Sequence, residues 1–300
     1  MKKFIIKSFA FILLLICTDF AIGKALKHLS AFAIGGDTYK NNYIAEKIDE
    51  DIIIMGSSKA SHHYVSSIIE DSIGYSCYNA GIDGNGIIRA YAYTVMFTQH
   101  HTPKIIVFDV IYSFDLFIND NVKYLGGVKP FYDKEHIADI FKEISCTEPY
   151  KMYSYMYRYN SKALQIIADM FAPQQNGIKG YRPLYGIIKH PKSEVNDDER
   201  EYDSLKIQYI ERLINLCKQK DIQLFFAISP NHCQTNIINY SPILSLAKKH
   251  NITLLNHLND TTFVGKNEFF KDAGHLNNEG ATLYTNIIVN ELKNHINTNK

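Results

Sequence analysis

The segment that most constrains the fold is 51–59, where a short apolar run with three consecutive isoleucines is followed at once by Gly-Ser-Ser-Lys. The β-branched run favours a buried strand, and Gly56 ends it. From about residue 61 to 73 the apolar residues take helical spacing. A hydroxyl between a strand and a helix lies where developing negative charge is stabilised. We therefore predict that Ser58 is a nucleophile; the alternative is a serine that caps the helix.

Strands and helices alternate along most of the chain. Helices of ordinary length between strands predict parallel pairing with helices on both faces of the sheet. The expected fold class is α/β: a flavodoxin-like three-layer sandwich with a central parallel sheet of about five strands and a helical insertion. The expected strands are 51–56, 75–79, 104–110, 222–228 and 252–255, and the expected helices are about 61–73, 87–101, 199–220, 241–250 and a closing helix that ends near 296.

The middle of the chain, roughly 114–198, interrupts this alternation. Turn signals such as Gly126-Gly127 separate predicted helices near 134–144 and 150–171. Two interpretations stay open. The segment is either an insertion that covers the carboxyl edge of the sheet and shapes a substrate cleft, or a helical layer without that role. The charged run 196–200 is expected to be the solvated start of the next helix.

The N-terminus has the pattern of an export signal. Three lysines, Lys2, Lys3 and Lys7, precede a long apolar run. The candidate cleavage site Ala21-Ile22-Gly23 is mediocre, and the residue before Cys17 is too large for a lipoprotein signal. Whether the leader is removed stays open, but we expect it to be kept as an anchor.

These signals give an expected organisation of three parts. Residues 1–24 are an N-terminal signal anchor that forms a transmembrane helix, 25–50 are a linker, and 51–300 are the α/β domain. The expected location is the inner (cytoplasmic) membrane, with the domain on the periplasmic or extracytoplasmic side. The alternative for such a helix, burial in a cytosolic core, is disfavoured by the placement of the lysines.

Composition excludes several classes of partner. The formal net charge is +1, which gives no electrostatic argument for nucleic acid. Five cysteines are scattered without any Cys-x-x-Cys or paired His/Cys spacing, so neither a metal site nor a cofactor is expected. The glycine-rich loop 81–86 has no lysine and contains Asp83, which disfavours a phosphate-binding loop.

The segment 270–281 supplies what a serine nucleophile needs. Acyl transfer through serine requires a base that takes its proton and a carboxylate that fixes the tautomer of the base. Asp272 and His275 lie three positions apart on a loop before the closing helix. We expect His275 to accept the proton of Ser58, with Asp272 either orienting the ring or lying beside it.

Taken together, these motifs resemble the SGNH (GDSL-like) hydrolase superfamily. They are Gly-x-Ser after the first strand, a glycine-rich loop at 79–86, and the closing Asp-x-x-His-Leu-Asn-x-x-Gly-Ala. The likeness covers about 51–112 and 222–296 and is closest to the membrane-anchored branch that acts on cell-envelope polysaccharides. It implies Ser58 as nucleophile and Asp272 with His275 as the acid–base pair.

The same resemblance implies an oxyanion hole. Its backbone donors are the N–H of Ser58 and that of Gly84, with Gly81 as the alternative. The family's Asn after the third strand is missing, because this chain reads Phe-Asp-Val-Ile-Tyr at 108–112. An ionised carboxylate cannot donate a hydrogen bond, so the hydroxyl of Tyr112 is the candidate third donor. The alternative is that Tyr112 packs under the insertion and the hole has two donors.

Two further histidine positions are of interest. His232 follows the fourth strand, at the edge of the sheet where ligands bind, and is a candidate substrate contact. His62 and His63 follow Ser58 by one turn and are expected to be a surface pair. Asn277 is expected to stabilise the start of the closing helix, and Asn79 is expected to bond within its own loop.

The expected function is that of an exported, membrane-anchored serine esterase or O-acyltransferase. It would act through an acyl-serine intermediate on acyl esters, most simply acetyl esters, of cell-envelope or secreted polysaccharide. The expected partners are the acylated carbohydrate, the membrane, and a membrane O-acyltransferase. The alternative is a catalytically inactive SGNH-like domain that binds glycan or that acyltransferase.

Overall fold

The computed structural model of the chain describes residues 1–159, 162–171, 177–189 and 201–298. These residues form two compact units, which are described separately. The anchor unit comprises 1–43 and 121–175, and the sheet unit comprises 44–120 and 176–300, in each case within the described ranges.

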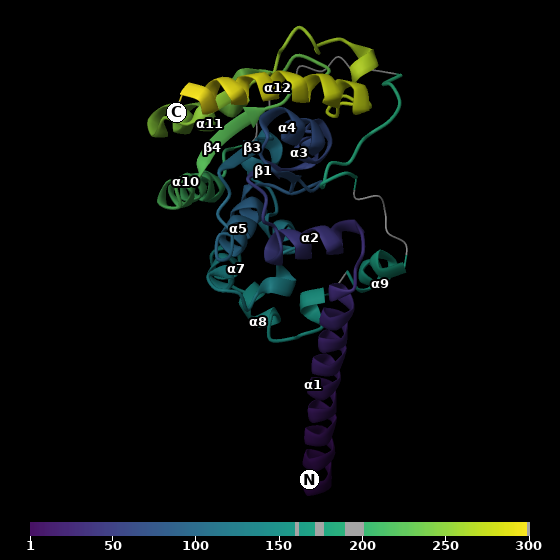
Figure 1. The fold of residues 1–300 in the computed structure, drawn as a ribbon. Helices are drawn as coiled ribbons and strands as arrows, with labels where there is room; N and C mark the ends of the chain where they lie inside the picture. Colours follow the sequence, from purple (N-terminus) through teal and green to yellow (C-terminus); the bar gives the residue numbers. More distant parts are fainter. Residues whose placement is uncertain (160–161, 172–176, 190–200, 299–300) are drawn as a thin grey trace. The chain divides into compact units, whose positions relative to one another are not determined.

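The sheet unit is built on a five-stranded parallel sheet (Figure 1). The strand order is β2-β1-β3-β4-β5, and every neighbouring pair runs parallel. The predicted α/β three-layer class is confirmed. The strands are β1 (Ile52–Gly56), β2 (Cys77–Asn79), β3 (Ile105–Asp109), β4 (Gln223–Ile228) and β5 (Thr253–Asn256).

The burial of the neighbouring inner strands β1 and β3 explains why their sequences are continuous apolar runs. Every residue of β1 and β3 is buried, as expected where helices cover both faces of a parallel sheet. Gly56 pairs with Asp109 at the carboxyl ends of these strands. The residues that follow both strands, including Ser58, therefore emerge at the same edge of the sheet.

Helices pack on the two faces of this sheet. On one face of the sheet, α12 packs against α3 and α4, and Ile52 and Ile54 of β1 belong to the same core. On the other face α5 packs against α10, and the hydroxyl of Thr94 in α5 donates a hydrogen bond to the sulfur of Met55. The helices of the unit are α3 (Ser58–His63), α4 (Ser66–Ile73), α5 (Ile87–Phe97), α6 (Tyr112–Asp115), α10 (Ser204–Gln219), α11 (Ser241–His250) and α12 (Asn278–Thr298), with 3₁₀ turns η4 (Ile237–Tyr240) and η5 (Asn267–Phe269).

In the described part of the anchor unit, all regular secondary structure is helical. Its first helix, α1 (Lys2–Ala31), is long and apolar enough to cross a membrane, with a mean hydropathy of 2.2 over its most apolar 18 residues. The other elements are α2 (Gly36–Glu46), which starts in this unit, η1 (Asn121–Leu125), η2 (Lys129–Phe131), α7 (Ile137–Ile144), α8 (Glu148–Lys151), η3 (Tyr157–Tyr159) and α9 (Ala163–Phe171).

Three predicted segments differ from the structure. The expected helix at 61–73 is broken between α3 and α4, because Tyr64 takes an extended conformation and buries its ring. The expected long helix at 150–171 is divided into the end of α8, η3 and α9. The segment 25–50, predicted as a linker, is largely helical, since it contains the end of α1 and the whole of α2. The run at 196–200 lies outside the described residues.

One glycine of the loop after β2 is required by packing. A Cβ on Gly81 would overlap the backbone nitrogen of Ser61 and lie 2.7 Å from the Cβ of Ala60. We therefore predict that Gly81→Ala lowers the free energy of unfolding by about 1–3 kcal/mol, measured by urea denaturation.

Gly126→Ala is the matched control, because the same added methyl group would meet its nearest neighbour at 3.4 Å. We expect that variant to stay within about 0.5 kcal/mol of the parent protein. Equal stability of the two variants would show that the loop after β2 is not held against α3 as described.

Candidate active site

Ser58 and His275 meet although they are far apart in the sequence. Ser58 is the first residue of α3, directly beyond β1, and His275 lies on the loop that precedes α12. The Nε2 atom of His275 is 2.8 Å from the Oγ atom of Ser58. This is hydrogen-bonding distance between a hydroxyl and a base, the arrangement that activates a serine.

Asp272 lies on the other side of the imidazole ring. The Nδ1 atom of His275 is 2.8 Å and 3.0 Å from the two carboxylate oxygens of Asp272. A proton on Nδ1 is donated to this carboxylate, which leaves Nε2 as the acceptor for the hydroxyl of Ser58. Asp272 is therefore placed to orient the ring, which is one of the two arrangements considered from the sequence.

The backbone of the same loop holds the carboxylate of Asp272. One of its oxygens accepts hydrogen bonds from the N–H groups of Gly274, at 2.9 Å, and His275, at 3.0 Å. Burial acts to raise the pKa of Asp272, but the hydrogen bonds from the His275 ring and from these N–H groups outweigh it and hold the pKa below its ordinary value. Asp272 is therefore ionised at neutral pH.

His232 supports this loop. Its backbone N–H donates to the carbonyl of Ala273 at 3.0 Å, its Nε2 is 2.7 Å from the side-chain oxygen of Asn267, and its ring packs on Phe270. The side chain is buried and does not line the cleft beside Ser58. The structure thus places the predicted substrate contact in a position that stabilises the loop of His275.

A cleft of about 180 Å³ opens beside Ser58. Tyr112, the candidate third donor, lines it together with Asn231 from the loop after β4. The buried carboxylate of Asp115 accepts from the N–H groups of Ile111 and Ile87, both at 2.7 Å, and so fixes the turn that carries Tyr112. The full lining is Ser58, Lys59, Ile111, Tyr112, Ser113, Phe114, Asn231, Tyr240, Gly274 and His275.

The two glycines proposed for the oxyanion hole differ in whether their backbone N–H already has an acceptor. The N–H of Gly81 donates to the side chain of Asn79 at 3.0 Å, so Asn79 does bond within its own loop. The N–H groups of Gly84 and Ser58 donate to no group within the described part of the chain. Gly84 has a φ of +69°, which glycine adopts readily. Between the two glycines, Gly84 therefore has the N–H that is free to donate.

The histidines after Ser58 do not form a surface pair. His62 and His63 are both buried, so that prediction was wrong. The Nε2 of His62 is 3.2 Å from Asp83, on the loop that carries Gly84, and its ring centroid is 5.8 Å from that of His275. His62 thus ties the glycine-rich loop to the side of the site. No signal in the sequence indicated this, because helical spacing alone does not show which side of a short helix is covered.

A buried pair of charges lies beneath the candidate nucleophile, and sequence reasoning did not include it. The Nζ of Lys59 donates to the carbonyl of Ser229 at 2.9 Å, and Asp109 accepts a short hydrogen bond from the hydroxyl of Tyr64. Burial lowers the pKa of Lys59 to about 8, although the charge of Asp109 opposes this shift. Burial also raises the pKa of Asp109 to about 6, against the opposing effects of Lys59 and Tyr64.

The chain contains a signal for one member of this pair. Asp109 is a carboxylate at the end of an apolar strand. Lys59 follows its strand in a turn, where a lysine can equally reach solvent, so its burial has no signal in the sequence. Buried charges of this kind require partners, and the two residues lie at the carboxyl ends of neighbouring strands.

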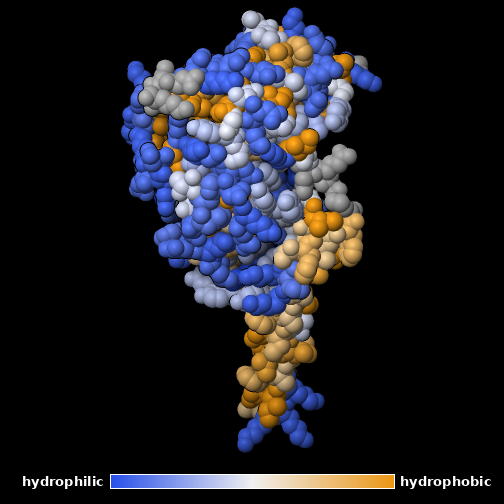
Figure 2. All heavy atoms as spheres, in the orientation of Figure 1, coloured by the Kyte–Doolittle hydropathy of each residue, from blue (hydrophilic) through white to orange (hydrophobic). Residues whose placement is uncertain are grey.

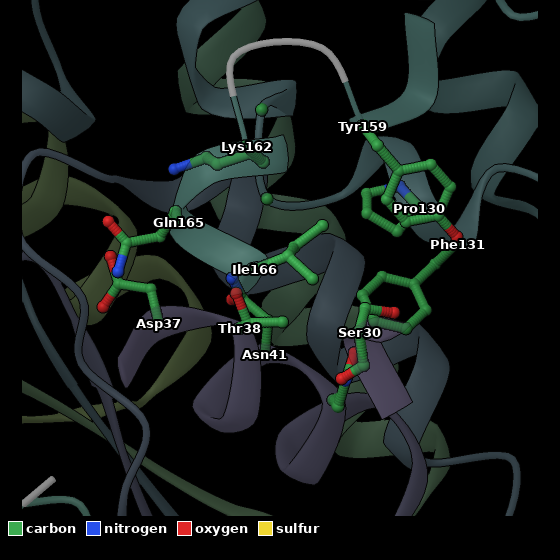
Figure 3. Close-up of a pocket in the computed structure, with 13 residues that line it drawn as sticks. Ser30, Asp37, Thr38, Asn41, Pro130, Phe131, Tyr159, Lys162, Gln165 and Ile166 are labelled. Carbon is green, nitrogen blue, oxygen red and sulfur yellow. The ribbon is translucent and has the colours of Figure 1, made fainter. Parts of the chain in front are cut away.

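A second hollow lies within the anchor unit and lacks the features of the first. Figure 3 shows Asp37, Thr38 and Asn41 of α2 and Gln165 and Ile166 of α9 around this space. Its lining contains no histidine, so it has no serine–histidine pair like that of Ser58 and His275. The candidate site is therefore the cleft of the sheet unit.

The raised pKa of Asp109 gives a pH-dependent stability. The folded protein binds a proton at Asp109 more tightly than the unfolded chain does, so this contribution is present below the ordinary pKa of 3.8 and is lost as the pH rises through about 6. The amide in Asp109→Asn cannot titrate. We predict that, from pH 4 to pH 7, the stability of the parent protein falls by about 2–3 kcal/mol relative to this variant, as measured by urea denaturation.

The control is Asp71→Asn, at an exposed position of α4. Its stability relative to the parent protein is expected to be constant over the same range. A parallel pH profile for Asp109→Asn and the parent protein would contradict the burial of an ionisable group at position 109.

Comparisons with known proteins give a limited picture. A scan against protein-family models and a search of curated proteins found no match. Among solved structures, the chain is similar to a protein from Desulfitobacterium hafniense DCB-2 described as a lipolytic protein of the G-D-S-L family, with a TM-score of 0.39 and 10% identity over 80% of this chain and 98% of that one. It is also similar to a protein from Bacteroides fragilis NCTC 9343 described as an acylhydrolase, with a TM-score of 0.39 and 12% identity over 84% of this chain and 94% of that one. Since both likenesses are weak, the reaction is inferred from the side chains around Ser58.

Proposed function

We propose that the protein is a serine esterase or O-acyltransferase that forms an acyl-enzyme at Ser58. One observation carries this proposal: the 2.8 Å contact between Ser58 Oγ and His275 Nε2, with Asp272 on the opposite ring nitrogen. The three side chains together supply a nucleophile, a base and a group that orients the base.

In the proposed first half-reaction, the Oγ of Ser58 attacks the carbonyl carbon of an ester while Nε2 of His275 takes its proton. The carbonyl π electrons move to the oxygen, and the N–H groups of Ser58 and Gly84 donate to the resulting oxyanion. Asp272 stabilises the imidazolium that forms. Collapse of the intermediate breaks the bond to the alcohol, which leaves with the proton of His275, and the acyl group stays on Ser58.

The second half-reaction repeats this sequence with another hydroxyl. Water as the acceptor gives hydrolysis, and a sugar hydroxyl gives transfer; both use His275 as the base. Each oxyanion donor typically contributes about 3–4 kcal/mol to the lowering of the barrier. The hydroxyl of Tyr112, which lines the cleft, is the proposed third donor in place of an amide.

We further propose that the substrate is an acylated carbohydrate of the cell envelope or a secreted polysaccharide, with acetyl as the simplest acyl group. The cleft beside Ser58 is lined by two partly exposed aromatic residues, Tyr112 and Phe114, together with Asn231. Flat apolar rings beside a few polar groups suit the mixed surface of a sugar ring.

The proposed location is the inner membrane, with α1 as an uncleaved anchor and the domain on the extracytoplasmic side. Lys2, Lys3 and Lys7 lie at the N-terminal end of α1, and lysines next to a membrane span favour the cytoplasmic side. A membrane O-acyltransferase that supplies acyl groups is a proposed partner of the transferase form.

The alternative function, a domain that binds glycan or an acyltransferase without catalysis, predicts that Ser58 is unreactive. A fluorophosphonate probe reacts with a serine only when a base activates it. We predict that the purified full-length protein is labelled, that Ser58→Ala is not, and that His275→Ala loses nearly all labelling. Ser245→Ala, at an exposed position of α11, is the control and keeps the label. An unlabelled parent protein, or equal labelling of Ser58→Ala, would support a domain that only binds.

Asp272→Asn tests the role of the carboxylate separately. The amide favours the wrong tautomer of His275, so we predict that turnover of p-nitrophenyl acetate falls by about 10²–10⁴-fold while the fold is kept. Asp71→Asn controls for the loss of a surface charge. Turnover within about twofold of the parent protein would exclude an orienting role for Asp272.

A further inference from the structure

The helix α9 of the anchor unit exposes one apolar face, and its inner side buries the carboxylate of Asp169 together with Ile166. A helix on the surface of a water-soluble domain turns its apolar side chains inward. In α9, the carboxylate of Asp169 is fully buried, whereas Leu164, Ile167 and Phe171 are 84%, 44% and 79% exposed. These three positions follow the i, i+3, i+7 spacing of one helix face.

The buried contacts of Asp169 show that this orientation is built into the unit. Its carboxylate accepts from the backbone N–H of Thr38 at 3.1 Å and from the side chain of Gln165 at 2.6 Å. A Cβ on Gly36 would overlap the same carboxylate, and Gly36 has a φ of +69°. Asp169 thus binds the N-terminal turn of α2, where a negative charge is favourable. Rotation of α9 to bury its apolar face would break these bonds.

A tyrosine-rich loop holds α1 at the point where its apolar run ends. Asp19 accepts from the hydroxyl of Ser154 at 2.5 Å and from the backbone N–H groups of Tyr155, at 2.7 Å, and Met156, at 3.2 Å. A Cβ on Gly23 would overlap the Cβ of Tyr155, so α1 and this loop are in close contact. Gly23, the last residue of the candidate cleavage site, is therefore buried against this loop, whereas Ala21 and Ile22 are exposed.

The outer side of this loop is aromatic and exposed. Tyr150 and Tyr153 are 73% and 82% exposed, and Met156 is 42% exposed. Lys24, on the next turn of α1, places its ammonium group 5.4 Å from the ring of Tyr155. Tyrosine beside lysine is the combination found where transmembrane helices leave the hydrocarbon layer.

We infer that these two exposed groups form one lipid-facing surface, composed of Tyr150, Tyr153, Met156, Leu164, Ile167 and Phe171, that lies in the interfacial region of the bilayer. The inference rests on the proposed membrane anchor. In Figure 2 the orange surface of α1 is followed by a second orange and tan surface where Figure 1 places α9. Because α9 packs against α1, its exposed apolar side chains lie near the helix that enters the membrane.

The chemistry of both groups indicates that the lipid bilayer covers this surface. Large aliphatic and aromatic side chains of α9 suit the boundary between head groups and acyl chains, where an amphipathic helix lies with its apolar face buried. The tyrosine loop supplies rings with a polar end, which prefer the same depth. Asp19, with its carboxylate hydrogen-bonded to the loop, fixes where the span ends. The surface would hold the anchor unit flat against the membrane and prevent it from turning freely about α1.

The absence of tryptophan from the sequence allows a direct test. Single-tryptophan variants of the full chain are reconstituted into phosphatidylcholine vesicles that contain a nitroxide near the top of the acyl chain. The reporters are Tyr153→Trp in the loop and Leu164→Trp in α9. Glu135→Trp, at an exposed position of the same unit, is the control outside the surface, and Phe11→Trp reports the anchor itself.

We expect the nitroxide to remove about half of the emission from Trp at positions 153 and 164 and to leave that at position 135 unchanged. Quenching at position 11, but not at both 153 and 164, would overturn the inference while keeping the anchor. Absence of quenching at position 11 would overturn the anchor and the inference together. Fluorophosphonate labelling of the same samples reports the proposed reaction independently of all these outcomes.

Discussion

The packing of α12 against α3 is the contact on which the candidate site depends. The N–H of Leu276, next to His275, donates to Nε2 of the buried His63 at 3.0 Å, and Thr285 of α12 bonds the carbonyl of His63 and the N–H of Val65. These bonds join the loop before α12 to the helix that begins at Ser58. They hold a base beside a hydroxyl from the opposite end of the domain, and any shift of α12 along α3 would separate the two.

Two buried residues of opposite charge lie beneath the site. The chain places a lysine directly after Ser58 and an aspartate at the end of the neighbouring strand, and it buries both. Their opposite charges reduce the cost that each would have alone. Lys59 donates to the carbonyls of Ser229 and Pro230, and one carboxylate oxygen of Asp109 accepts from the hydroxyl of Tyr64. Through its bond to the carbonyl of Ser229, Lys59 ties the first turn of α3, which also carries Ser58, to the end of β4.

Much of the sheet could be predicted from the sequence, because a buried parallel strand has a strong local signature. The apolar runs at β1, β3 and β4 were placed within one or two residues, and so was α11. The proximity of Ser58, Asp272 and His275 could be proposed because each residue type has a known role in acyl transfer. The burial of His62 and Lys59 could not, since it depends on segments that arrive from elsewhere in the chain, such as Arg182 and Ser229. The exposed apolar face of α9 could not be predicted for the same reason, since its orientation depends on a carboxylate that binds α2.

The most direct measurement is the mass of the peptide that carries Ser58 after the protein has been mixed briefly with p-nitrophenyl acetate and quenched in acid. If Ser58 is the nucleophile, this peptide gains one acetyl group, fragmentation places the group on Ser58, and the adduct is missing from His275→Ala. An acetyl group found only on Lys59 or on other amines, or equal acetylation of Ser58 in the parent protein and His275→Ala, would contradict an acyl-enzyme formed with His275 as the base.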